Sequence, residues 1–216
     1  MDFELITRSL PLLIKGTGVT LEITAAAVFL GMCIGCIMGI MRLCNYKILR
    51  GIAAVYVDCI RGTPLLVQIF IVYFALPAIL GFRIEKFPAA VMACSINSGA
   101  YVAEIFRAGI QSIDAGQMEA GRSLGLTWWQ TMRFIILPQA FKRVIPPLGN
   151  EFIAMLKDSS LVSVIGFEEL TRTGQLVIAR TYASLEIWTC VALIYLFMVL
   201  VVARFVAKLE KRFETK

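Results

Sequence analysis

Several apolar runs in this chain are as long as a lipid bilayer is thick, and they restrict the fold more than any other feature. A helix needs roughly 20 apolar residues to cross the hydrocarbon core of a membrane. Of the 216 residues, 59% are hydrophobic and 17% are charged, whereas a soluble domain carries about a quarter charged residues. We therefore predict an all-α integral membrane protein, since helices satisfy their own backbone hydrogen bonds in lipid.

Five segments have the length and composition of membrane spans. They cover about 19–41, 55–80, 87–110, 145–167 and 186–203, after a short amphipathic lead over residues 1–15. The second is interrupted by Arg61-Gly62-Thr63-Pro64, where the proline predicts a kink or hinge because it removes a helix hydrogen bond. In the first, Gly31, Gly35 and Gly39 stand four apart and form a face that lets helices approach closely. We expect a single domain, residues 1–216, of five transmembrane helices.

The basic residues predict the orientation of the chain. With five spans, thirteen lysines and arginines fall on one side and six on the other: Arg42, Lys47, Arg50, Arg107, Arg122, Arg133, Lys142, Arg143, Arg204, Lys208, Lys211, Arg212 and Lys216 against Arg8, Lys15, Arg83, Lys86, Arg172 and Arg180. Loops rich in these residues stay in the cytoplasm. We therefore predict an external N-terminus and a cytoplasmic C-terminus. The net charge of +6 is then a sign of topology and not of nucleic-acid binding.

The polar stretch at about 111–143 falls on the cytoplasmic side and predicts a helix-turn-helix. Residues 117–124 are mostly good helix formers, and Gly125 suits the end of that helix. Thr127 and Gln130 have the spacing of a capping box, which predicts a second helix over 128–137. Pro138 predicts a stop or a kink after it. Taken alone, these signals also fit an amphipathic connector at the membrane surface, where tryptophan is common.

Metal chemistry is not predicted. The chain has no histidine, which is the commonest metal ligand. Cys33 and Cys36 have the spacing of a redox or metal pair, but they lie within an apolar helix, where cysteine acts as a small hydrophobic residue.

The cytoplasmic stretch resembles the EAA loop of bacterial ABC-transporter permeases, which seats their ATPase subunit. Seven residues stand at the spacings of that pattern: Glu119, Ala120, Gly121, Gly125, Ile135, Leu137 and Pro138. The resemblance implies that they couple the permease to the ATPase. The departure is Gly121, where the pattern usually has a second alanine, and a glycine loosens a helix by up to ~1 kcal/mol.

Three further motifs resemble the HisMQ-like permeases of polar amino-acid importers. They are Arg61-Gly62-Thr63-Pro64-Leu65, Asn97-x-x-Ala100-Tyr101-x-x-Glu104 and Leu156-Lys157-Asp158-Ser159-Ser160-Leu161. The resemblance implies a type I ABC importer fold in the cytoplasmic (inner) membrane of a bacterium. It also implies three protein partners: an ABC ATPase subunit, a second permease copy that is identical or similar, and an external solute-binding protein. The chain has no GxxxxGK[ST] run, so we expect it to be no enzyme and to hold no cofactor, with ATP and Mg²⁺ on the ATPase.

Charged residues within spanning segments are costly and are therefore candidates for function. Asn97 and Glu104 are two turns apart on one helix face, and Glu151, Met155 and Asp158 share a face of the next span. We predict that the substrate path is lined by Asn97, Glu104, Glu151, Met155, Asp158 and Val162. Carboxylates would accept the ammonium group of an amino acid, and an amide would donate to its carboxylate.

Several alternatives stay open for these residues. Lys157 and Asp158 also fit a structural ion pair or a helix cap, and Glu104 also fits packing between subunits. The excess of carboxylates favours a cationic substrate such as arginine or lysine. A permease for glutamine, cystine or an opine, and a membrane scaffold without transport, are the other interpretations.

Overall fold

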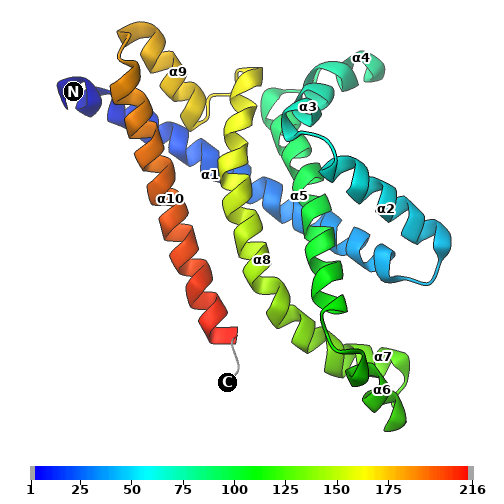
Figure 1. Ribbon diagram of the computed structural model, residues 1–216. Helices are drawn as coiled ribbons and strands as arrows, with labels where there is room; N and C mark the ends of the chain where they lie inside the picture. The colour runs from blue at the N-terminus through cyan, green and yellow to red at the C-terminus, as the bar shows by residue number, and fades with distance from the viewer. Residues whose placement is uncertain (1–2, 214–216) are drawn as a thin grey trace.

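The computed structural model describes residues 3–213 and contains helices and no strand over that range (Figure 1). The elements are α1 (Phe3–Leu43), α2 (Lys47–Arg61), α3 (Leu65–Phe70), the π-helix η1 (Ile71–Ala75), α4 (Leu76–Leu80), α5 (Lys86–Gln111), α6 (Ala115–Ser123), α7 (Trp128–Thr131), the π-helix η2 (Met132–Ile136), α8 (Leu137–Asp158), the 3₁₀ helix η3 (Ser159–Ile165), α9 (Leu170–Thr181) and α10 (Ser184–Phe213). The prediction of an all-α protein is confirmed. Lys216, which entered the charge count, lies outside the described residues.

The first helix is longer than the sequence suggested. α1 runs without a break over 41 residues and includes Pro11, so the lead over residues 1–15 and the first span are one helix. Its glycine face packs directly on another helix, as predicted, and that helix is α5. A Cβ at Gly35 would lie 2.4 Å from Cγ1 of Val102, and one at Gly31 would lie 2.8 Å from Cβ of Ser98. The close approach of α1 and α5 therefore depends on glycine at these positions.

The second predicted span is two helices with a sharp bend. α2 and the segment Leu65–Leu80 meet at 104° across the break. Pro64 is extended, with φ −65° and ψ 138°, and starts α3 as its N-cap residue. The proline thus ends one helix and begins the next, which is a stronger break than the predicted kink.

Among the described residues, three helices are long and apolar enough to cross a bilayer, within Glu4–Leu43, Lys86–Gln111 and Ser184–Arg212, and the bent pair brings this number to as many as four. α8 has 22 residues but carries five charged side chains: Lys142, Arg143, Glu151, Lys157 and Asp158. Its composition therefore does not mark it as a span, and a fifth membrane crossing at 145–167 stays a prediction.

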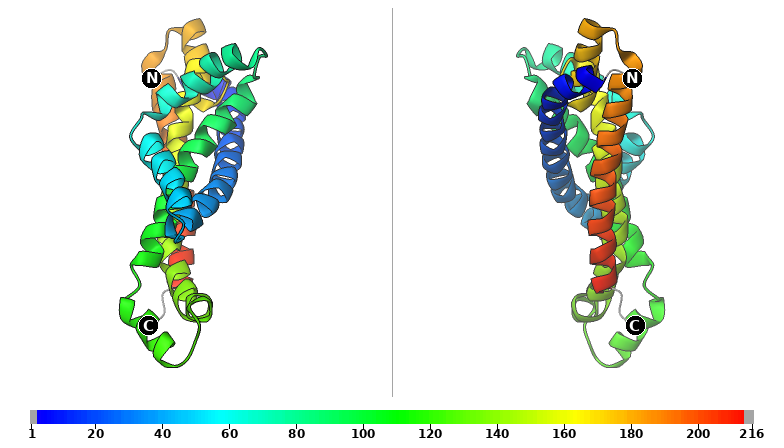
Figure 2. Two further views of the ribbon diagram at one scale, coloured as in Figure 1. Left: turned by 90° about the vertical axis from the view of Figure 1, so that its right-hand side faces the viewer. Right: turned by 90° about the vertical axis from the view of Figure 1, so that its left-hand side faces the viewer.

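The bundle is elongated, with α6 and α7 at one end and α9 at the other (Figure 2). α10 ends on the same side as α6 and α7, and α1 begins beside α9 (Figure 1). The arrangement therefore puts the polar stretch and the C-terminal end of α10 on one side, as the count of basic residues required.

A buried carboxylate fixes the end of the bundle that holds α9. Glu169 is fully buried and caps α9, accepting hydrogen bonds from the backbone N–H groups of Thr171 (2.9 Å) and Arg172 (2.7 Å). It also accepts from the hydroxyl of Tyr195 on α10 (3.0 Å) and, more weakly, from that of Thr20 on α1 (3.4 Å). One side chain therefore joins three helices, and nothing in the sequence pattern had singled it out.

Candidate functional site

The segment from Asp114 to Pro138, here called the coupling segment, folds as a hairpin of short helices. Asp114 caps α6 by accepting from the N–H of Gly116 at 2.7 Å. Gly125 adopts φ +84° after the last turn, and the N–H of Leu126 returns to the carbonyl of Gly121 at 3.1 Å. This is the turn in which glycine is favoured at the end of a helix. The predicted role of Gly125 is confirmed.

The second half of the hairpin begins with the predicted capping box. The hydroxyl of Thr127 accepts from the N–H of Gln130 (3.2 Å), and the Gln130 side chain accepts from the N–H of Thr127 (2.8 Å). After α7 the chain passes through the π-helix η2 directly into α8, where Pro138 occupies the first turn. The predicted stop at Pro138 is therefore wrong, while the predicted kink there stays a prediction.

The coupling segment is held on the bundle by a small apolar cluster. Ile113, Ile136 and Ala140 are buried in it, with Met118 and Met132 packed against them. The outer surface is apolar as well: Leu124 is 81% exposed and Trp129 is 75% exposed. The rings of Trp128 and Trp129 meet edge to face with their centroids 4.8 Å apart. Large exposed apolar side chains of this kind mark a surface that contacts a protein partner or the membrane.

The seven predicted coupling residues differ in their surroundings. Glu119, Ala120, Gly125, Leu137 and Pro138 are exposed, Ile135 is partly buried and Gly121 is buried. Gly121, where the EAA pattern usually has alanine, faces α7. A Cβ there would lie 2.5 Å from Cγ2 and 2.8 Å from Oγ1 of Thr131. The glycine is therefore the point at which α6 and α7 touch, and the sequence had left its packing open.

The six predicted substrate residues lie in three different environments. Met155 and Val162 belong to the apolar core that α1, α3, α5, α8 and η3 form together, and neither is more than 1% exposed. Glu151 is 9% exposed, and Asp158 is exposed at the end of α8. Asn97 and Glu104 both bond to other side chains of this chain. The role of these six residues as a substrate path therefore stays a prediction.

Asn97 is bonded to a residue that the sequence analysis missed. Its side-chain N–H donates to Oε1 of Gln68 at 3.0 Å. The Gln68 amide in turn donates to the carbonyl of Ile60 (2.8 Å) and to both oxygens of Thr63 (3.1 and 3.0 Å). These carbonyls are freed where α2 breaks, and unpaired backbone groups are costly when buried. Gln68 thus holds the bend between α2 and α3, and it lies four residues after Pro64, where a glutamine in an apolar helix was a visible signal.

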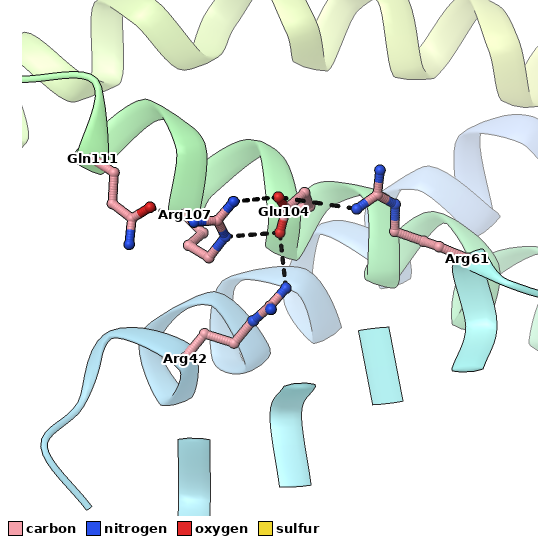
Figure 3. Close-up of polar contacts among 5 residues, drawn as sticks. All are labelled: Arg42, Arg61, Glu104, Arg107 and Gln111. Carbon is pink, nitrogen blue, oxygen red and sulfur yellow. Dashed lines mark hydrogen bonds and ion pairs between the residues drawn. The ribbon is translucent and has the colours of Figure 1, made fainter. Parts of the chain in front are cut away.

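Glu104 is surrounded by three arginines, as Figure 3 shows. Arg42 donates to Oε2 at 2.8 Å, Arg107 donates to both carboxylate oxygens, and Arg61 lies 4.0 Å from Oε1. The guanidinium of Arg61 also lies over the ring of Tyr101, 5.2 Å from its centroid. Asn97 and Glu104 do share a face of α5, as predicted. Asn97 bonds to Gln68 just after the α2–α3 break, and Glu104 lies near Arg61 just before it.

Comparison with known proteins places this geometry in one family. Residues 31–215 match the family described as "Binding-protein-dependent transport system inner membrane component". The chain is 46% identical over 212 residues to the glutamine transport system permease protein GlnP of Escherichia coli (strain K12), covering 98% of this chain and 97% of the relative. It is 40% identical over 212 residues to the arginine transport system permease protein ArtQ of Bacillus subtilis (strain 168), covering 98% and 96%.

A solved structure agrees with these relatives. The crystal structure of an amino acid ABC transporter with histidines superposes with a TM-score of 0.94 at 44% identity, covering 98% of this chain and 99% of that one. The chain therefore has the fold of a type I ABC importer permease, which includes the break between α2 and α3 and the coupling segment. The chain therefore belongs to the family of binding-protein-dependent transport system inner membrane components, the permease subunits of ABC importers.

Proposed function

We propose that this chain forms the translocation path of an ATP-driven importer for polar amino acids, with glutamine as the first candidate. The observation that carries the proposal is the coupling segment. It projects from one end of the bundle (Figures 1 and 2) and exposes Glu119, Leu124 and Trp129. A rigid apolar hairpin with a charged residue can receive motion from a soluble ATPase and pass it to α5 and α8, which flank it in the chain.

The choice of glutamine depends on how many carboxylates of the proposed path lie beside positively charged residues of this chain. The sequence favours a cationic substrate because it places three carboxylates, Glu104, Glu151 and Asp158, in the predicted path. Glu104 is now paired with arginines, and Lys157 adjoins Asp158 in the chain. Fewer carboxylates are therefore left for a cationic side chain. The 46% identity to the glutamine permease of Escherichia coli supports the same choice.

Arginine is the second candidate, because Glu151 and Asp158 lie on one face of α8 and a relative at 40% identity is an arginine permease. For either substrate we keep Asn97, Glu104, Glu151, Met155, Asp158 and Val162 as the proposed path. Met155 and Val162 are buried in this conformation, so the path would require α8 and η3 to move away from α3 during transport.

We further propose the partners and orientation that such an importer needs. An ABC ATPase that carries ATP and Mg²⁺ would seat on the coupling segment, and an external solute-binding protein would deliver the substrate at the α9 end. A second permease copy would cover apolar side chains of α10 such as Leu193 and Phe197, which are 58% and 69% exposed. The coupling segment and the C-terminus would face the cytoplasm of a bacterium, with the N-terminus outside.

ATP hydrolysis by the complete complex tests the substrate. The complex and its binding protein are reconstituted, and hydrolysis is measured with glutamine, arginine, lysine and cystine. We expect glutamine to stimulate most. Glu151→Gln should change the concentration of substrate that gives half-maximal stimulation, whereas Glu210→Gln, a partly exposed acid near the C-terminal end of α10, should not. If Glu151→Gln behaves as wild type, the proposed path is wrong.

Co-purification tests the seat of the ATPase. Tagged permease should retain the ATPase subunit, and a variant with both Glu119→Lys and Gly125→Val should lose it. Retention by the double variant would refute the assignment of the coupling segment.

A further inference from the structure

The arginines around Glu104 carry more charge than the carboxylate can neutralise. Arg42, Arg61 and Arg107, here called the arginine cluster, come from α1, α2 and α5 and converge on one side chain (Figure 3). Three positive charges against one negative charge leave a surplus of two. Among residues 3–213, no second carboxylate lies within 4.0 Å of these guanidinium groups. A surplus of this size next to lipid attracts an anion.

The arginine cluster lies near the ends of two long apolar helices, α1 and α5, and the ends of membrane-spanning helices are where headgroups are met. Arg42 is one residue from the end of α1, and Glu104 is seven residues from the end of α5, which is about 10 Å at the rise of an α-helix. Beyond that end the chain enters the polar coupling segment. Tyr101, beside Arg61, is 37% exposed, and tyrosine is enriched at the boundary between lipid and water.

The arginines retain donors for a further ligand. Arg61 is 39% exposed and approaches Glu104 only to 4.0 Å, which is too far for a hydrogen bond. Arg107 and Arg42 are 28% and 18% exposed, and Arg107 also donates to the side-chain oxygen of Gln111. A guanidinium offers five N–H donors in a planar fork that matches phosphate oxygens, and one carboxylate cannot use the donors of three such groups.

We propose that the arginine cluster binds the headgroup phosphate of an anionic phospholipid. Basic sites between transmembrane helices near the cytoplasmic surface bind such headgroups. The assignment to the cytoplasmic leaflet depends on the proposed orientation, but the binding itself does not. A phosphate held there would connect α1, α2 and α5 at Arg61, the last residue before the break that Gln68 fixes. Anionic lipid would then hold the bend in place.

Native mass spectrometry of the detergent-purified complex, titrated with phosphatidylglycerol and with phosphatidylcholine, tests this proposal. Wild type should bind phosphatidylglycerol more tightly than phosphatidylcholine. Arg61→Gln should weaken phosphatidylglycerol binding about fivefold, the effect of one basic residue near an anionic headgroup. Glu104→Gln should strengthen it by a similar factor, since it raises the surplus from two charges to three. Lys208→Gln, which removes an exposed lysine of α10, is the matched control and should change nothing.

The opposite effects expected of Arg61→Gln and Glu104→Gln on lipid affinity distinguish a headgroup site from a structural role. If the cluster only holds the helices together, Arg61→Gln and Glu104→Gln should both disturb it and neither should gain affinity. Three other results would overturn the proposal. They are equal affinity for the two lipids, a loss of phosphatidylglycerol affinity in Lys208→Gln as large as in Arg61→Gln, and displacement of the lipid by millimolar inorganic phosphate. Displacement by glutamine or arginine would instead assign the cluster to the substrate path.

Discussion

Replacing Gly121 by alanine would test how the two halves of the coupling segment fit together. The new Cβ would lie 2.5 Å from Cγ2, 2.8 Å from Oγ1 of Thr131 and 3.2 Å from Cδ1 of Ile135. Thr131 is fully buried, and its hydroxyl donates to the carbonyl of Thr127 at 3.1 Å. The threonine therefore cannot turn away without losing that bond, and α6 would have to separate from α7.

The expected change in the stability of the hairpin is the difference between two opposing effects. Alanine is favoured over glycine within a helix by about 1 kcal/mol, while inserting a methyl group into a packed contact costs about 1–3 kcal/mol. We expect the clash to dominate and Gly121→Ala to destabilise the hairpin by up to about 2 kcal/mol. Thr131→Ala alone loses a hydrogen bond and leaves a small void. In the double variant the alanine methyl group fills that void, so the two substitutions should compensate by more than about 1 kcal/mol.

Hydrogen exchange of residues 115–131 and binding of the ATPase subunit would measure these effects. Gly121→Ala should exchange faster and bind more weakly, and the double variant should recover toward wild type. Gly51→Ala in α2 is the control, because a Cβ there meets nothing within 4 Å. The reasoning is refuted if Gly121→Ala exchanges like wild type, or if the double variant is worse than both single variants.

Three further substitutions have clear expected outcomes. Gly125→Ala places a side chain at φ +84° and should cost about 1–2 kcal/mol, seen as weaker ATPase binding with an unchanged thermal midpoint of the bundle. Gly35→Ala puts a Cβ 2.4 Å from Val102 and should lower that midpoint, whereas Gly18→Ala, with nothing within 4 Å, should not; equal midpoints would contradict the packing of α1 on α5. Burial raises the pKa of Glu169 above its ordinary value, against four donors that lower it. Its contribution to stability is therefore greatest at low pH and falls as pH rises through the folded-state pKa, so Glu169→Gln should flatten the dependence of the thermal midpoint on pH, and an unchanged slope would contradict this.

The local signals in the sequence predicted local structure well. Three predicted features are confirmed: the capping box at Thr127, the turn at Gly125 and the glycine face of α1. Each depends on residues within a few positions of each other. The helical nature of the chain follows from apolar runs of bilayer length. At Pro138 the predicted stop is wrong, because the helical run continues through the π-helix η2 into α8.

The contacts between distant helices could not be predicted in this way. Glu104 had the pattern of a substrate ligand, since it is a charge within a span, but its three arginines come from positions 42, 61 and 107. Glu169 lies in a polar connector and gave no signal, although it joins α1, α9 and α10. Both arrangements depend on how the helices cross, and crossing is set by packing over the whole bundle.

The most direct test is uptake into proteoliposomes that contain the permease, its ATPase subunit and its binding protein, with labelled glutamine outside. ATP on the side of the coupling segment should drive accumulation, and Glu119→Lys with Gly125→Val should reduce it at least tenfold while the permease stays folded. Accumulation without ATP, or an unchanged rate in the double variant, would contradict the account that the coupling segment transmits the energy of ATP to amino-acid import.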